Sequence, residues 1–116
     1  MISTHVLDTA LGQPAAGVPV TLELMGSGAG AVESGREIGR ASTDADGRVR
    51  ELAPSGAALV AGRYRIRFDT GAYFDAQGIH AFYPEVSVVF VVRDATQHHH
   101  VPLLLSPYGY STYRGS

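Results

Sequence analysis

The sequence contains no cysteine and no lysine among its 116 residues. Without cysteine, a thiol nucleophile, a thiolate metal site and a disulfide framework are all excluded. The nine basic residues are therefore all arginine, and genomic base composition is the simplest cause of that bias. Each arginine is accordingly judged by its position. Apolar runs of the roughly 20 residues that a membrane span requires are also missing.

The net charge and the length of the chain further restrict the class of protein. A net charge of −2 argues against a nucleic-acid groove or a polybasic membrane patch. The stretch from Met1 to His5 has neither the basic nor the apolar region of a secretory signal, so we expect a cytoplasmic protein. With 45% hydrophobic residues, the chain is expected to form one domain, residues 1–116, around a single core.

Short strands dominate the chain. The clearest is 63–68, where Arg63, Arg65 and Arg67 alternate with apolar residues and are expected to form a solvated sheet face. Residues 85–93 are a β-branched run typical of a central strand covered on both sides. Residues 48–52 are expected to pair back on 36–43 as a hairpin, through a turn at Asp44 to Gly47. Further strands are predicted at 2–8, 18–24, 98–105 and 108–116.

One stretch, 69–78, has room for a short helix, with Thr70 as its cap and Gly78 as its end. Residues 27–35 are rich in glycine, serine and alanine and are expected to form a surface loop. The number of short strands and the spacing of the turns predict a mainly β fold: a two-sheet antiparallel sandwich of about eight strands with one short helix.

Histidines are concentrated at 98–100. Strand alternation places His98 and His100 on one face and His99 on the other. Imidazoles two residues apart, with His5 as a third ligand, can hold zinc. The absence of a nearby carboxylate and the apolar residues after His100 favour instead a site without metal, or a partly exposed strand whose histidines have no function.

Other polar residues are candidates for a site. His5 is expected to face outward from the first strand. Arg48 follows a tight turn, where a rigidly held guanidinium suits a planar anion or a polarised carbonyl. The segment 108–116 is dense in hydroxyl groups and aromatic rings, which suit a polar ligand and a neighbouring subunit, or simply cover a sheet edge.

Five segments together resemble the transthyretin-like 5-hydroxyisourate hydrolases. They are residues 2–9, 12–18, the turn 43–48, the run from His98 to Tyr108, and the terminal Tyr113-Arg114-Gly115-Ser116. The resemblance covers the whole chain. The terminal Tyr-Arg-Gly-Ser is its most specific part, because that motif marks the hydrolases and is absent from the hormone carrier transthyretin, which has the same fold.

The resemblance implies a transthyretin-like sandwich that dimerises edge to edge and pairs into a homotetramer, with active sites between the dimers. It implies hydrolysis of 5-hydroxyisourate to 2-oxo-4-hydroxy-4-carboxy-5-ureidoimidazoline in urate degradation, with neither metal nor organic cofactor. The catalytic positions of the family fall on His5, Arg48, His100 and Ser116, and its substrate-binding positions on Tyr113, Arg114 and Gly115. It assigns no role to His98.

The residue types suit that chemistry. Opening a ring carbonyl at neutral pH needs a base such as imidazole to take a proton from water, and a cation or hydroxyl to stabilise the developing negative charge. The alternative is a transthyretin-type protein that binds a small aromatic ligand without catalysis. That function would need an apolar channel and would not require the terminal Tyr113-Arg114-Gly115-Ser116.

Overall fold

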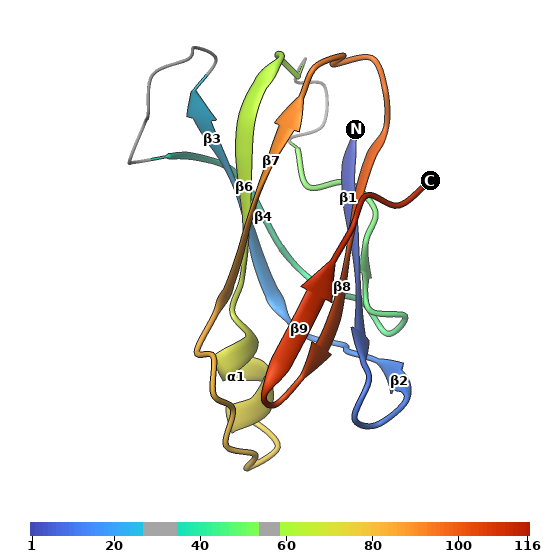
Figure 1. Ribbon diagram of the computed structural model, residues 1–116, viewed down its shortest axis with the longest axis vertical. Coiled ribbons are helices and arrows are strands. Elements are labelled where there is room, and N and C mark those ends of the chain that lie inside the picture. Colours follow the sequence, from blue (N-terminus) through green and yellow to red (C-terminus); the bar gives the residue numbers. More distant parts are fainter. Residues whose placement is uncertain (27–34, 54–58) are drawn as a thin grey trace.

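The computed structural model describes residues 1–26, 35–53 and 59–116, so most of the predicted 27–35 loop lies outside the described residues. Figure 1 shows the elements in chain order. They are β1 (Ile2–Asp8), β2 (Gln13–Pro14), β3 (Pro19–Gly26), β4 (Arg36–Ser42), β5 (Arg48–Val49), β6 (Gly62–Phe68), α1 (Thr70–Asp75), β7 (Val86–Val92), β8 (His99–Ser106) and β9 (Gly109–Thr112).

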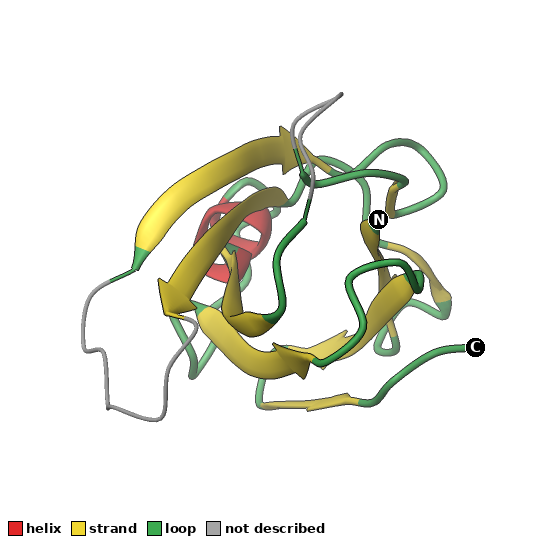
Figure 2. Cartoon of the chain, turned by 90° about the horizontal axis from the view of Figure 1, so that it is seen from above, coloured by secondary structure: helices red, strands yellow, loops and turns green. Residues whose placement is uncertain are grey.

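The strands form two sheets that face each other, with α1 at one end (Figures 1 and 2). One sheet has the order β2-β1-β8-β9 with β5 on β1, and the other has the order β4-β3-β6-β7. Side chains from both sheets fill the space between them, including Val6 and Leu103 from one and Leu22, Ile66 and Phe68 from the other. The predicted mainly β sandwich with one short helix is confirmed.

One strand pair departs from the predicted antiparallel pattern. β1 runs parallel to β8, and this register sets Ser3 opposite His100 and His5 opposite Pro102. Nearly the whole chain separates these two strands, so no short turn constrains their direction. The parallel pairing brings the two histidine-bearing strands side by side.

The predicted hairpin between 36–43 and 48–52 is wrong. The turn itself forms, with Gly47 at φ 77°, but β5 then pairs with β1, with His5 opposite Arg48. The carbonyl of Gly47 accepts a hydrogen bond of 2.7 Å from Val6 N, and a Cβ at Gly47 would collide with the carbonyl of Val6. Because the turn is packed against β1 in this way, the chain crosses from one sheet to the other there.

The helix begins one residue away from the expected cap. Asp69, not Thr70, is the N-cap, and its side chain accepts a hydrogen bond of 3.0 Å from Ala72 N. Thr70 is instead fully buried. The helix ends shortly before Gly78, which has the positive φ of 67° expected of a residue after a helix. Among the described residues, no helix has the length and apolar character needed to cross a membrane.

Strand β7 lies at the edge of its sheet rather than at the centre. Its Val89 and Val91 are about half exposed, so the apolar run is not covered on both sides as predicted. The last strand is also shorter than expected: β9 ends at Thr112, and the residues beyond it leave the sheet except for one bridge between Gly115 and His100.

Candidate active site

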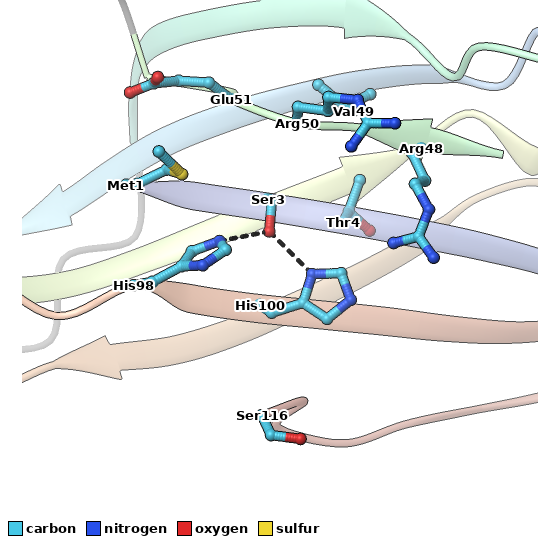
Figure 3. A pocket seen from close by; sticks show the side chains of 10 residues that line it. All are labelled: Met1, Ser3, Thr4, Arg48, Val49, Arg50, Glu51, His98, His100 and Ser116. Atoms are coloured by element: carbon cyan, nitrogen blue, oxygen red, sulfur yellow. Dashed lines mark hydrogen bonds between the residues drawn. The ribbon is translucent and has the colours of Figure 1, made fainter. Parts of the chain in front are cut away.

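A cavity of about 420 Å³ opens beside β1, β5 and the start of β8, and Figure 3 shows its walls. Three strands distant in sequence supply its side chains because β1 pairs with both β5 and β8. The lining residues are Met1, Ser3, Thr4, Arg48, Val49, Arg50, Glu51, His98, His100 and Ser116.

Strand alternation distributes the histidines as predicted. His98 and His100 both line the cavity, whereas His99 points into the protein and is 5% exposed. His99 Nδ1 donates a hydrogen bond of 3.0 Å to the carbonyl of Gln97. Burial lowers the pKa of His99, and the nearby Arg114 lowers it further. His99 is therefore a buried, neutral side chain outside the cavity.

Ser3 joins the two cavity histidines, and sequence reasoning missed it. Its Oγ lies 2.7 Å from His98 Nε2 and 2.8 Å from His100 Nδ1. A signal was present, because Ser3 is two residues before His5 and so occupies the same face of the first strand. What could not be foreseen was the parallel register that sets Ser3 opposite His100.

His100 is half buried, and its environment favours the neutral ring. Burial lowers its pKa below the ordinary 6.5, and the positive charges of His98, Arg48 and His5 act in the same direction. At neutral pH His100 therefore presents an uncharged imidazole, the form that accepts a proton.

Arg48 reaches the cavity from a rigid turn. The Asp44 carboxylate accepts hydrogen bonds of 2.9 Å from the backbone N–H groups of Asp46 and Arg48, and the carbonyl of Arg48 accepts one of 2.9 Å from Asp44 N. The Arg48 hydrogen bond is the main reason that the pKa of Asp44 is lowered. The guanidinium is thus carried by a stretch of backbone with little freedom.

His5 is held at the rim of this arrangement. Its Nε2 donates a hydrogen bond of 2.8 Å to the carbonyl of Asp46, in the turn that leads to Arg48. Because a carbonyl only accepts, a neutral His5 carries its proton on Nε2 and has a bare Nδ1. His5 is not among the lining residues, but it lies opposite Arg48 in the β1–β5 pair.

The C-terminal segment divides between two hollows. Gly115 N donates a hydrogen bond of 2.8 Å to the carbonyl of His100, which brings Ser116 to the cavity. Tyr113 and Arg114 instead line a smaller hollow of about 130 Å³ between β7 and β8. Arg114 Nη2 donates a hydrogen bond of 3.3 Å to Gln97 Oε1. The structure therefore groups Arg48, His100 and Ser116 around one cavity, with His5 adjacent.

Comparison with known proteins places the chain in a family. The model of the HIUase/Transthyretin family matches residues 2–115. A probable 5-hydroxyisourate hydrolase of Caenorhabditis elegans is 46% identical over 115 residues, covering 99% of this chain and 81% of the relative. The chain belongs to the HIUase/transthyretin family. A 5-hydroxyisourate hydrolase of Salmonella dublin is 44% identical and matches all of this chain over 81% of its own length.

Solved structures of a hydrolase and of a transthyretin are both similar to this chain in fold. Klebsiella pneumoniae 5-hydroxyisourate hydrolase superposes with a TM-score of 0.83 at 37% identity, covering 99% of this chain and 98% of that one. Sea bream transthyretin in complex with thyroxine superposes with a TM-score of 0.85 at 31% identity, covering 98% and 93%. Because the hydrolase and the transthyretin have the same fold, the fold alone does not separate catalysis from ligand binding. The residues that line the cavity must make that distinction.

Within the HIUase/transthyretin fold, this cavity offers groups that can exchange protons. Across residues 1–26, 35–53 and 59–116, no three histidine or carboxylate side chains are grouped as metal ligands are. His98 and His100 each direct one ring nitrogen at Ser3 Oγ (Figure 3). A neutral imidazole beside a fixed guanidinium can take a proton from water and stabilise negative charge.

Proposed function

We propose that this chain hydrolyses 5-hydroxyisourate to 2-oxo-4-hydroxy-4-carboxy-5-ureidoimidazoline, a step of urate degradation. Two lines of argument support the substrate and the reaction. The relatives from Caenorhabditis elegans, Salmonella dublin and Klebsiella pneumoniae carry the name of this hydrolase. The single observation that carries the chemistry is the neutral His100 beside Arg48 in one cavity.

In the proposed reaction, His100 is the general base. Its lowered pKa keeps the ring neutral at pH 7, so the bare nitrogen can take a proton from water as the water oxygen attacks the ring carbonyl. His5 supplies a second imidazole near the same site, and the two rings divide the work of accepting and donating protons. Hydrolysis consumes only water, and the proposed mechanism uses no metal or organic cofactor.

Arg48 stabilises the charge that develops on the attacked carbonyl oxygen. The turn from Asp44 to Arg48 holds the backbone of Arg48 through hydrogen bonds on both sides, so the guanidinium needs little rearrangement during the reaction. Loss of one such donor costs about 3 to 4 kcal/mol of transition-state stabilisation in related chemistry. Ser116, with Tyr113, Arg114 and Gly115 of the same segment, is proposed to hold the substrate ring.

We further propose that the protein assembles as a homotetramer, a dimer of dimers with sites between the dimers. Support comes from the apolar and aromatic side chains left uncovered on one copy, among them Val89 and Val91 on the edge strand β7 and Tyr110 on β9. The cavity itself is open to solvent on one side in a single copy, and a neighbouring copy would close it.

The alternative of a small-ligand carrier rests on the fold alone. Sea bream transthyretin in complex with thyroxine has this fold, but the cavity here is lined by two imidazoles, two guanidiniums and a carboxylate. Such a lining suits a small polar substrate better than a large apolar ligand.

The test is an ultraviolet assay of freshly made 5-hydroxyisourate, generated by urate oxidase, with and without the purified protein. The proposal predicts that the protein accelerates the decay of the ultraviolet signal and that heat-denatured protein does not. Decay at the spontaneous rate in the presence of folded protein would remove the hydrolase function.

A further inference from the structure

A hydrogen-bonded group that the proposed mechanism leaves unused lies along one wall of the cavity. Ser3 Oγ contacts His98 Nε2 at 2.7 Å and His100 Nδ1 at 2.8 Å. Figure 3 shows both rings turned towards this hydroxyl, and the other nitrogen of His100 on the side of Arg48. Within the described residues, that other nitrogen, Nε2, has no hydrogen-bond partner and faces the cavity that His100 lines.

A hydroxyl carries a single proton, so there are two arrangements in which Ser3 donates to one ring and accepts from the other. In the first, Ser3 accepts from His100 Nδ1–H and donates to His98 Nε2, so that His100 Nε2 is bare. In the second, His98 Nε2–H donates to Ser3 and Ser3 donates to His100 Nδ1, so that His100 Nε2 carries the proton. The positive charge of Arg48 favours the first arrangement at rest, because it attracts a lone pair and repels an N–H.

The two histidines differ in their access to water. His98 is exposed, whereas His100 is half buried and the charged form of its ring is disfavoured by burial. Burial therefore disfavours an added proton on His100, whereas water has access to the ring of His98. Among the residues that the structure describes, the Ser3 hydroxyl is the one group hydrogen-bonded to both rings, and it can carry the proton between them.

We propose that Ser3 and His98 are positioning residues that draw the proton of the reaction away from His100, through a His98–Ser3–His100 relay. This inference rests on the proposed function, with His100 as the base. As the water oxygen bonds to the carbonyl carbon, His100 Nε2 takes a proton from the water. The proton on Nδ1 passes to Ser3 Oγ while the hydroxyl proton of Ser3 passes to His98 Nε2.

The proton count balances at the end of this step. His98 has gained one proton and is an imidazolium in contact with water, and Ser3 is again a neutral hydroxyl. His100 is neutral, with its single proton on Nε2 facing the cavity. When the carbonyl re-forms, His100 donates this proton to the leaving ring nitrogen while the relay runs in reverse. Ser3 returns its hydroxyl proton to His100 Nδ1 and takes the added proton back from His98 Nε2, which restores the starting arrangement. The relay thus converts one ring from base to acid without leaving a charge in its half-buried position.

Substitutions at His98 separate a proton relay from a merely structural hydrogen bond. His98→Gln retains an amide that can hydrogen-bond to Ser3 but cannot accept a proton. The relay predicts that His98→Gln and Ser3→Ala each lower kcat about tenfold or more, with KM changed by less than about twofold. Ser3→Thr keeps the hydroxyl and is expected to restore most of kcat. His80→Gln, at an exposed histidine outside the cavity, is the matched control.

Tautomers give a second readout that does not depend on turnover. In ¹⁵N NMR spectra of the full-length protein, His100 is expected to show a protonated Nδ1 and a bare Nε2 at neutral pH. Ser3→Ala removes the acceptor of Nδ1–H, so the ring is expected to shift towards the Nε2–H tautomer that free histidine prefers in water. Thermal unfolding of each variant checks that it is folded.

The outcomes are distinguishable. Wild-type kcat in folded His98→Gln overturns the relay while leaving the hydrolase intact, as does a His100 tautomer that Ser3→Ala leaves unchanged. A wild-type protein that fails to accelerate the decay of 5-hydroxyisourate overturns the proposed function and, with it, the catalytic use of the relay, even where the NMR spectra show the expected tautomer.

Discussion

At the scale of single residues, burial sets the charge of two neighbouring histidines that face opposite ways. Desolvation is the first cause that lowers the pKa of both His99 and His100. On His99, inside the sandwich, the effect keeps a charge out of the core. On His100, in the cavity, the same effect keeps a base available at neutral pH. Desolvation therefore has a structural consequence at one position and a chemical consequence at the next.

The lowered pKa of His99 predicts how stability depends on pH. On unfolding, the ring returns to water and to an ordinary pKa of about 6.5. At low pH the unfolded chain then binds a proton that the folded chain does not. The free energy of unfolding is therefore highest, with respect to this group, above about pH 6.5, and it decreases as the pH falls below that value. Urea denaturation at several pH values should show a flatter dependence between pH 7 and pH 5 in His99→Phe than in the wild type. Equal slopes would contradict this account.

At this scale, sequence reasoning was correct where strand alternation alone determines on which face a side chain lies. It placed His98 and His100 together and His99 apart, and it identified Arg48 beside a tight turn. It missed Ser3, because the two hydrogen-bond partners of Ser3 lie 95 and 97 residues away in the sequence. It also treated Arg65 as a solvated residue, although the structure places it in an ion pair.

At the scale of elements, that ion pair ties the middle of β3 to β6. Arg65 Nε lies 2.7 Å from Glu23 Oε1, with the two side chains 23% and 10% exposed. Glu23 and Arg65 lie directly opposite each other in the β3–β6 register, and Glu23 is buried. Alternation alone does not reveal such a pair, because the partner of Arg65 depends on which strand pairs with β6 and in which register.

Removal of this arginine should destabilise the sandwich. Arg65→Ala leaves the nearly buried Glu23 carboxylate with one remaining ion-pair partner among the described residues, Arg67 at 4.0 Å. We expect a loss of about 2 kcal/mol in the free energy of unfolding, less than for a fully buried pair because Arg65 is partly exposed. Arg63→Ala, on the same face of β6, is the control and should cost much less. Chemical denaturation compares the two, and equal losses would show that the ion pair contributes little.

The C-terminal segment is positioned by its close approach to β8. A Cβ added at Gly115 would lie 2.5 Å from His100 Cδ2, and Ser3 restrains that ring on its other side. Gly115→Ala must therefore displace either His100 or the segment that carries Ser116. Since a shift of about 1 Å in a catalytic group can cost about 100-fold, we expect a fall of that order in kcat/KM with little change in thermal stability. Wild-type kinetics would show that this contact does not position the site.

At the scale of the whole molecule, turn and strand patterns predicted the sandwich but not every pairing within it. The Asp44–Gly47 turn resembles a hairpin turn in sequence, yet its contact with Val6 sends β5 to β1 in the other sheet. The run 85–93 was predicted to be central because it is apolar, but its strand β7 is an edge strand with exposed valines. Composition cannot tell a strand buried inside one chain from one that a second copy covers.

That distinction leads to a prediction about assembly. If other copies cover the exposed side chains of β7 and β9, the protein in solution should have about four times the mass of the 12.3 kDa chain. Sedimentation equilibrium measures this mass directly. Replacement of Val89, an exposed edge residue outside the cavity, by aspartate should reduce the mass while each chain remains folded. A monomeric wild-type protein at micromolar concentration would contradict the proposed tetramer.

The most direct test of the central claim compares the initial rate of 5-hydroxyisourate ring opening in His100→Ala and in the matched control His80→Ala. His100 lines the cavity beside Arg48, whereas His80 is exposed and lies outside it. The account predicts that kcat/KM falls by about 100-fold or more in His100→Ala and stays at the wild-type value in His80→Ala. Equal rates in the two folded variants would show that His100 does not carry the reaction.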